Sequence, residues 1–521
     1  MKELKFSLKA KIAAYTGLIA LLVVLGCGLP QQASAIGSGD ADTVFNGYNN
    51  AFLVNGNYYQ TYDSNTRSMV FDGGWTGALD IMVAEDAYER TGSSGHKALV
   101  NALCTTFLQK FPPGYTWDGY NDDVGWIGAM LARGYLITGN ANLLLQARTA
   151  CFDMAWSRGW DTQYNGGGIW EQQPNMTPQG QAINKTPLSN DSLGKTACLI
   201  YQGNHDQWYL DRATQIYDWV WHNLYNNSTG QVYSWIDRSG NVDRNTADAT
   251  AYNQGTFADY ANYLYQITGN VNYYNDAQKA LDYVKNTMYN GGVITGGGTN
   301  TWSDEYARGL GHFCRDNRQW GTYYNWMVLN ANAIMSHRRT DYNICWGNFS
   351  QQTPNNNTTT TNRYDDAAAW LQYTPVTMPN NIWGRHAIVG MNNMAIDNGG
   401  GFTTSSSNIA NVELWGLSYN QNQLWNFTQN ADTSWNIVSE SSWQALDVPG
   451  GNTGNNTQMV QWLLSRDSNQ RWWVDQQSDG SYKIWNQSSS LALDTSSTST
   501  NGFPLTQWPW GGGPQQRWQL R

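Results

Sequence analysis

Charged side chains are scarce in this chain. Lys, Arg, Asp and Glu make up 13% of its 521 residues, about half of the usual ~25%. Basic residues are the scarcer kind, with 30 Lys and Arg against 40 Asp and Glu, and the formal net charge is −10. No basic stripe runs along the sequence, so nucleic acid is excluded as an expected partner.

Long apolar runs are absent after the N-terminus, and none approaches the ~20 residues that span a membrane. The exception, Leu18–Leu25, follows a lysine-rich start and precedes Ala33-Ser34-Ala35. This order is typical of a secretory signal peptide. We expect residues 1–35 to be removed by cleavage after Ala35, which predicts a secreted protein. A lipoprotein anchored at Cys27 is the alternative, which Leu25 disfavours.

Cysteine is rare, and the sequence has neither a CxxC pair nor an HExxH motif; its six His are scattered. No metal site and no cofactor are therefore expected. Five cysteines follow Cys27, an odd number that leaves at least one free. We expect small buried residues, with one or two disulfides as an open alternative. They are Cys104, Cys151, Cys198, Cys314 and Cys345.

Aromatic residues, in contrast, are plentiful. The chain has 27 Trp among 14% aromatics, and its polar surface is built from Asn, Gln, Ser, Thr, Gly and Tyr rather than from charges. Trp offers a flat apolar face with an N–H group at its edge, which matches the C–H faces and hydroxyl edges of sugar rings. The composition favours a carbohydrate ligand, although most of the Trp are expected in the core.

Residues 40–350 show helical periodicity, which is interrupted by a recurring five-residue motif ending in Thr-Gly. It occurs at Tyr88–Gly92, Tyr135–Gly139 and Tyr265–Gly269, with a weaker echo at Tyr201–Asn204. Thr-Gly ends a helix and the next Asn or Ser begins another, so the pattern predicts stacked helical hairpins. About twelve helices closed into a ring would form an (α/α)6 toroid; an open solenoid is the competing geometry. We place this domain at 40–374, with a last helix near Asp365–Gln372.

After a linker at 375–382, the sequence pattern changes. Short stretches in which apolar and polar residues alternate are separated by polar turns, which predicts short strands. The triplets Gln423-Leu424-Trp425, Gln470-Arg471-Trp472 and Gln516-Arg517-Trp518 are 47 and 46 residues apart. Each triplet has a Trp ten residues upstream and an apolar-Asp step before that Trp. Three copies in register predict an all-β structure with three-fold symmetry over 383–521.

This region resembles the ricin-type β-trefoil lectins. The resemblance implies that in each repeat an Asp accepts bonds from sugar hydroxyls, an upstream Trp stacks on the ring, and an amide adds bonds, while the Q-x-W residues form framework. The first repeat has the longer Asp-to-Trp spacing and is expected to be the weakest. The implied sites are Asp397, Trp415 and Asn422; Asp447, Trp462 and Asn469; and Asp494, Trp508 and Gln515.

The segment Gly119–Trp126, GYNDDVGW, leads into an apolar helix. Asn121 is a suitable N-cap, and Asp122 and Asp123 fall in the first turn, where acids complement the helix dipole. A catalytic role in glycoside hydrolysis would require two carboxyl groups close to the glycosidic bond. Neighbouring Cα atoms are ~3.8 Å apart, so carboxyls about 5–6 Å apart are attainable, which suits retaining rather than inverting glycosidases.

The first domain resembles glycoside hydrolase family 76, the endo-α-1,6-mannanases. The resemblance rests on the order of Asp122-Asp123, Trp126, Gly159–Asp161, Gly166–Trp170, Lys185–Asn190, Tyr252–Gly255 and Phe313–Arg315. It implies that Asp122 is the nucleophile and Asp123 the acid/base. Glu171, where a second Trp is common, departs from the family pattern. We expect Trp126, Trp170 and Asn253 to bind substrate.

Together these features predict a secreted, retaining endo-α-1,6-mannanase without a cofactor, held on polysaccharide by its trefoil and acting as a monomer. A transglycosidase that remodels wall mannan is one alternative. A mannan-binding protein without catalysis is another, disfavoured by the intact Asp pair. A related (α/α)6 lyase or unsaturated-glycoside hydrolase is a further alternative, which the family motifs disfavour.

Overall fold

The structure is a computed structural model that describes residues 36–173, 183–244, 251–294, 303–355, 361, 364–399, 410–430 and 432–521. The expected signal peptide, with its cleavage site and Cys27, lies outside these residues. No helix of the described residues is long and apolar enough to cross a membrane.

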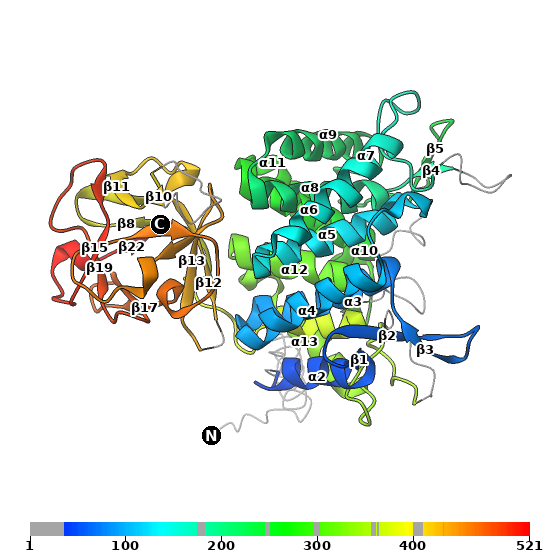
Figure 1. Ribbon diagram of the computed structural model, residues 1–521, viewed down its shortest axis with the longest axis horizontal. Helices are drawn as coiled ribbons and strands as arrows, with labels where there is room; N and C mark the ends of the chain where they lie inside the picture. Colours follow the sequence, from blue (N-terminus) through cyan, green and yellow to red (C-terminus); the bar gives the residue numbers. More distant parts are fainter. Residues whose placement is uncertain are drawn as a thin grey trace, which may run out of the picture. The chain divides into compact units, whose positions relative to one another are not determined.

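The first region is a closed ring of helices, coloured from blue to yellow-green in Figure 1. Six inner helices pack in succession, and the last one, α14, returns to α3 and closes the ring. The inner helices are α3 (Gly74–Thr91), α5 (Asn121–Thr138), α8 (Pro187–Asn204), α10 (Ala251–Thr268), α12 (Asp304–Asn317) and α14 (Asp365–Tyr373). This is the predicted (α/α)6 toroid rather than a solenoid.

An outer helix backs each inner one. The third outer helix changes from α to π and back to α, so it is described in three parts. The outer set is α2 (Asp40–Phe52), α4 (Ser94–Lys110), α6 (Ala141–Gln146) with η2 (Ala147–Phe152) and α7 (Asp153–Gly159), α9 (Gln207–Asn223), α11 (Val271–Thr287) and α13 (Trp320–His337).

The recurring Thr-Gly phrase marks the turns between paired helices, as predicted. Gly92, Gly139 and Gly269 end their helices in the left-handed region, with φ between 61° and 75°, where glycine is least strained. The side chain of the next residue then caps the following helix. Asn140, for example, accepts a bond from the backbone N of Asn142 at 3.2 Å.

Charged side chains fill the middle of the ring, although the chain has few of them. The Arg308 side chain is fully buried; its Nε lies 3.0 Å from Asp86, and its Nη1 lies 2.8 Å from Glu305. Lys195 lies 2.8 Å from Asp259 and 3.0 Å from Glu305. Because an unpaired buried charge is very costly, these pairs tie the inner helices to one another.

Short strands occur between the helices, which the helical periodicity did not predict. They are β1 (Leu53–Val54), β2 (Tyr58–Asp63) and β3 (Ser68–Phe71), which form one antiparallel sheet, and the pairs β4 (Asn184–Lys185) with β5 (Ile236–Asp237) and β6 (Tyr289–Asn290) with β7 (Val293–Ile294). All five cysteines of the described residues are buried and free, so the predicted reading as small buried residues is confirmed.

The second region is built from short strands joined by 3₁₀ turns. The strands are β8 (Gly384–Val389), β9 (Met394–Asp397), β10 (Ala410–Asn411), β11 (Glu413–Gly416), β12 (Leu424–Gln429), β13 (Trp435–Ser439), β14 (Ala445–Asp447), β15 (Thr457–Gln458), β16 (Val460–Trp462), β17 (Trp472–Gln476), β18 (Tyr482–Asn486), β19 (Ala492–Asp494), β20 (Phe503–Pro504), β21 (Thr506–Trp508) and β22 (Gln519–Leu520).

The three Q-x-W triplets form its framework, as expected. Trp425, Trp472 and Trp518 are fully buried in the core. Each indole N–H donates to a backbone carbonyl just before the repeat's Asp, at 2.9, 3.0 and 3.3 Å. The same bond in each repeat satisfies the one polar group of a buried Trp, which explains why the triplet recurs.

Candidate active site

One cavity opens at the end of the ring where the inner helices begin. It encloses about 740 Å³ of empty space, part of it open to solvent. Its walls come from the first two turns of α3, α5, α8, α10 and α12, and from Tyr120 and Glu171 outside the helices; the N-termini of the helices carry partial positive charge that stabilises nearby anions. The lining residues are Trp75, Leu79, Tyr120, Asp122, Asp123, Trp126, Glu171, Leu188, Tyr252, Asp304 and Glu305.

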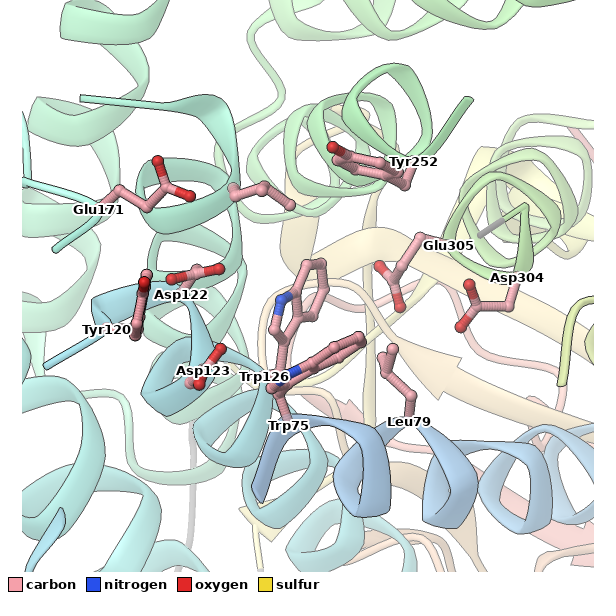
Figure 2. A pocket seen from close by; sticks show the side chains of 11 residues that line it. Trp75, Leu79, Tyr120, Asp122, Asp123, Trp126, Glu171, Tyr252, Asp304 and Glu305 are labelled. Atoms are coloured by element: carbon pink, nitrogen blue, oxygen red, sulfur yellow. The ribbon is translucent and has the colours of Figure 1, made fainter. Parts of the chain in front are cut away.

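Carboxyl groups stand on two sides of this cavity. Figure 2 shows Asp122, Asp123 and Glu171 on one side, with Asp304 and Glu305 on the other. The indoles of Trp75 and Trp126 lie between the two groups, so the predicted Asp pair and the predicted Trp126 are brought together. The combination of acids and flat apolar rings fits the hydroxyls and C–H faces of a sugar.

Asn121 fixes the approach of the next wall segment, but it is not the N-cap that we expected. It is the first residue of α5, and Tyr120 occupies the cap position without a side-chain bond. The Asn121 amide instead donates to the Trp170 carbonyl at 2.7 Å, and its backbone N donates to the Glu171 carbonyl at 2.7 Å. These two bonds hold Glu171 beside the Asp pair.

The two aspartates share a perturbed environment. Burial raises the pKa of Asp122 well above its usual value, and the neighbouring charges of Asp123 and Glu171 raise it further; backbone N–H groups at the helix start oppose this. Burial, with Asp118 and Glu171, raises the pKa of Asp123 to about 7. Like charges so close disfavour double ionisation, so the pair holds one proton near neutral pH.

The opposite wall is tied to the charges inside the ring. Burial raises the pKa of Asp304, while Arg308 opposes this. For Glu305 the charges of Lys195 and Arg308 outweigh burial and hold the pKa below its usual value. Glu305 therefore stays ionised. One oxygen of Asp304, Oδ1, is buried without a hydrogen-bond partner in the described chain.

Trp170 does not line the cavity, contrary to our expectation. It is 3% exposed, its indole N–H donates to Asp161 Oδ2 at 2.9 Å, and the Lys185 ammonium lies 4.6 Å from its ring centre. In extended backbone, consecutive side chains point to opposite sides. Trp170 thus faces the loop, and Glu171, the next residue, faces the cavity.

Lys185 explains two of the other motifs. Its ammonium donates to the backbone carbonyls of Asp161, Tyr164 and Gly167 at 2.8, 2.7 and 2.5 Å. The Gly159–Asp161 and Gly166–Trp170 stretches therefore form one loop, held together around a buried cation. These motifs therefore support the wall of the cavity from behind and do not themselves line it, apart from Glu171, which follows them.

Asn253 is also buried, at 3% exposed, and is not among the lining residues. Its neighbour Tyr252 lines the cavity instead. Sequence reasoning missed Trp75, Glu171, Tyr252, Asp304 and Glu305. The last two repeat the signal of the Asp pair, since they are consecutive acids in the first turn of an inner helix.

In two of the three repeats, the predicted amide and carboxylate side chains are hydrogen-bonded to each other. Asn422 donates to Asp397 at 2.7 Å, and Asn469 donates to Asp447 at 3.0 Å. The Q-x-W glutamines reach the same two carboxylates, at 3.1 and 2.8 Å. The first repeat, expected to be the weakest, thus matches the second in these bonds.

The third repeat is different. The Asp494 carboxylate accepts a bond from the backbone N–H of Ser496 at 2.5 Å, and no side-chain bond joins it to Gln515 in the described residues. Trp415 and Trp508 are 44% and 38% exposed, whereas Trp462 is half-buried. Open stacking faces therefore occur in the first and third repeats, and complete amide–carboxylate pairs in the first and second.

The chain matches known proteins in both regions. Residues 48–380 match the model of glycosyl hydrolase family 76, and residues 389–521 match, in three overlapping stretches, the model of the ricin-type beta-trefoil lectin domain-like family. A mannan endo-1,6-alpha-mannosidase of Saccharomyces cerevisiae is 32% identical over 161 residues, which is 30% of this chain and 35% of the length of that relative.

Solved structures share the fold of the helical ring. The GH76A alpha-1,6-mannanase from Salegentibacter sp. HEL1_6 has a TM-score of 0.55 at 22% identity, covering 64% of this chain and 97% of that one. A GH76 alpha-mannanase of Bacteroides thetaiotaomicron has a TM-score of 0.53 at 18% identity, covering 64% and 93%. The match to the family model over most of the chain shows that this protein belongs to glycosyl hydrolase family 76 and carries a ricin-type β-trefoil domain.

Proposed function

We propose that this chain is a secreted endo-acting glycoside hydrolase that cleaves α-1,6-linked mannan with retention of configuration. The observation that carries the proposal is the cavity in which Asp122 and Asp123 stand beside Trp75 and Trp126. It is supported by the relatives, which are described as alpha-1,6-mannanases or as a mannan endo-1,6-alpha-mannosidase. One related structure is an inactive variant with two consecutive aspartates replaced, in complex with alpha-1,6-mannotetrose.

In the first step, the Asp122 carboxylate attacks the anomeric carbon and forms an ester bond to it. The glycosidic C–O bond breaks, and the proton of Asp123 passes to the leaving oxygen. In the second step, Asp123 takes a proton from water, whose oxygen attacks the anomeric carbon and releases Asp122. The raised pKa of Asp123, about 7, suits a group that must be an acid first and a base later.

The helix start affects the two carboxyls differently. The backbone N–H groups of Asp122 and Asp123 act to lower the pKa of the Asp122 carboxyl, and the α5 dipole acts in the same direction. Asp123 has no such donors among the contributions to its pKa. These donors favour the anion on Asp122, while its deeper burial acts in the opposite direction; the division of roles between the two carboxyls therefore rests on the resemblance to the family.

The other groups of the cavity would hold the polymer. Trp75, Trp126 and Tyr252 offer faces for sugar rings, and Asp304 and Glu305 offer acceptors for hydroxyls on the far side. We propose that the trefoil keeps the enzyme on the polysaccharide through several weak sites, which raises the local substrate concentration. Secretion rests on residues 1–35 alone, and we expect a monomer.

Two other functions fit parts of the site. A transglycosidase would use the same ester intermediate but pass the sugar to another mannan chain instead of water. A binding protein would use the cavity and the trefoil without cleavage. The two raised carboxyl pKa values at one sugar-sized cavity favour chemistry over binding alone.

The test is incubation of the purified chain with α-1,6-mannan backbone, and in parallel with β-mannan, xylan and chitin. We expect short oligosaccharides from the α-1,6-mannan only, with the α anomer formed first in NMR spectra. Elongated products would favour the transglycosidase, and β anomers would refute retention. Asp122→Asn should abolish cleavage. Asp42→Asn, which changes a first-turn acid of α2 outside the cavity, is the matched control.

A further inference from the structure

The β17–β18 hairpin of the trefoil carries an aromatic face that none of the three Q-x-W sites uses. Trp473 pairs with Trp485 across the two strands, and Asp475 pairs with Lys483. Strand alternation separates these four residues from Trp472 and Ile484, which are fully buried in the core. The four side chains therefore project together from the outer side of the hairpin.

The outer face is an ordered set of contacts. The two indole rings lie 5.9 Å apart between centres, tilted by 33°. The Trp485 indole N–H donates to Asp475 Oδ2 at 2.7 Å, and the Lys483 ammonium lies 4.4 Å from the Trp485 ring centre. Apolar ring faces thus stand beside one anionic acceptor and one cationic donor.

The trefoil framework does not demand these residues. In the first repeat, the register of β12 and β13 places Asn426 and Val438 at the positions of Trp473 and Trp485. In the third repeat, Gln519 pairs with Val389 at the same place. One repeat of three carries the indole pair, so the pair serves something other than the shared fold.

The face continues toward the third repeat. The Lys483 ammonium also lies 5.6 Å from the ring centre of Trp510, and Trp510 is two residues from Trp508, the exposed stacking residue of the third Q-x-W site. The Lys483 ammonium therefore joins the Trp485 ring of the hairpin to the ring of Trp510, which is close in sequence to the third Q-x-W site.

We propose that Trp473, Trp485, Asp475 and Lys483 form a further carbohydrate-binding site, which holds the polysaccharide that the third repeat also contacts. The occupant is a neutral hexose polymer. Indole faces match sugar C–H faces, the Asp475 carboxylate accepts from hydroxyls, and Lys483 donates to them. The identity of the polymer as α-mannan rests on the proposed function.

The two indoles also have a plainer role, since a cross-strand aromatic pair stabilises a hairpin. The first variant therefore combines Trp473→Asn with Trp485→Val, because Asn and Val are the residues that the first repeat has at these two positions. A second variant, Asp475→Thr with Lys483→Asn, makes the matching change at the polar pair and leaves both indoles in place.

The experiment is affinity gel electrophoresis of the full chain in α-1,6-mannan, with Asp122→Asn added so that the gel polymer is not cut. Melting temperatures are measured beside it, and hydrolysis of short soluble mannosides is measured in chains that keep Asp122. We expect each pair variant to raise the apparent Kd by about threefold to tenfold, the effect of losing one of several weak sites, with hydrolysis unchanged and a melting temperature lowered by no more than about 4 °C.

Retention of the Trp pair variant equal to that of the parent would overturn the proposal, and so would a fall in melting temperature without a loss of retention. A parent chain that no mannan gel retains would overturn it as well. Hydrolysis is scored separately, so retention without cleavage of α-1,6-mannan would refute the proposed function and leave the site standing.

Discussion

Glu171 lies in the same cavity as Asp123, and its charge adds to burial and to Asp118 in raising the pKa of the Asp123 carboxyl to about 7. It raises the pKa of Asp122 as well. No ion pair balances Glu171 in the described residues. Its place in the cavity, at a position where a second Trp is common in the family, makes it one of the charges that raise the pKa values of both aspartates.

Glu171→Gln should move the whole pH profile of kcat/KM toward lower pH. Removing a negative charge favours ionisation of both aspartates, so the acidic and the alkaline limb both shift in that direction. The measurement is kcat/KM on a soluble mannoside between pH 4 and 9. Glu171→Asp, which keeps the charge, should shift the profile less. An unchanged profile, or a shift to higher pH, contradicts the role.

Asp123→Asn should lose most activity on mannan but keep it on substrates with good leaving groups. A nitrophenolate leaves without a proton, so the first step no longer needs the acid. We expect a loss of about 10²–10⁴-fold on polymer. Rate constants on aryl mannosides of differing leaving-group pKa measure the rescue. Near-parental activity on polymer would reduce the pair to a helix-capping role.

The second trefoil site should weaken in acid. Burial raises the pKa of Asp447 to about 6, although bonds from Gln470 and Asn469 oppose this. Below that pH the carboxyl is protonated and accepts fewer bonds from hydroxyls; at pH 5 about one tenth remains ionised. In the Asp122→Asn chain, retention by mannan gels should fall between pH 7.5 and 5. The same fall in Asp447→Asn would assign it to another group.

We expect the buried carboxyl group of Asp191 to destabilise the folded state at neutral pH. Both of its carboxylate oxygens are buried without a hydrogen-bond partner in the described residues, and burial raises its pKa well above the usual value. A raised folded-state pKa means that the loss of stability is absent below the unfolded-state pKa and grows as pH rises above it.

Asp191→Asn should therefore raise the melting temperature at pH 7 by at least about 2 °C, the size of about 1 kcal/mol in domains of 150–250 residues, and raise it less at pH 4. Differential scanning fluorimetry at both pH values measures this. Asp211→Asn, at an exposed carboxyl of α9, is the control. A lower melting temperature at pH 7 would mean that the ionised form is the stabilising one.

Arg308→Met should destabilise the ring severely. Arg308 is fully buried and contacts Asp86, Asp304 and Glu305, so its loss removes a shared cation from three buried carboxylates and leaves Asp304 without an ion pair in the described residues. We expect a cost of about 3–5 kcal/mol. Arg517→Met, at a partly exposed pair with Asp479, should cost about 0–1 kcal/mol. Chemical denaturation of both variants makes the comparison; equal effects would show that the inner charges are not tightly coupled.

The sequence could predict features that depend on neighbouring residues. Thr-Gly turns, the Q-x-W framework and the Asp122-Asp123 pair all follow from local geometry. It could not place the far wall, because Asp304 and Glu305 reach the cavity through ring closure. The family motif led us to expect Trp170 rather than Glu171 in the site, whereas strand alternation decides which of the two residues faces it. Asn121 was misassigned because its amide binds another segment rather than its own helix.

The return of α14 to α3 has a consequence for how the protein is made. The first inner helix keeps an open side until the ribosome has synthesised residue 373, the end of the last one. Contacts between segments so distant in sequence form late, because a long loop must be ordered first. The emerging chain therefore exposes unsealed helical surface for most of its synthesis, and holding chaperones are expected to bind there until translation passes α14.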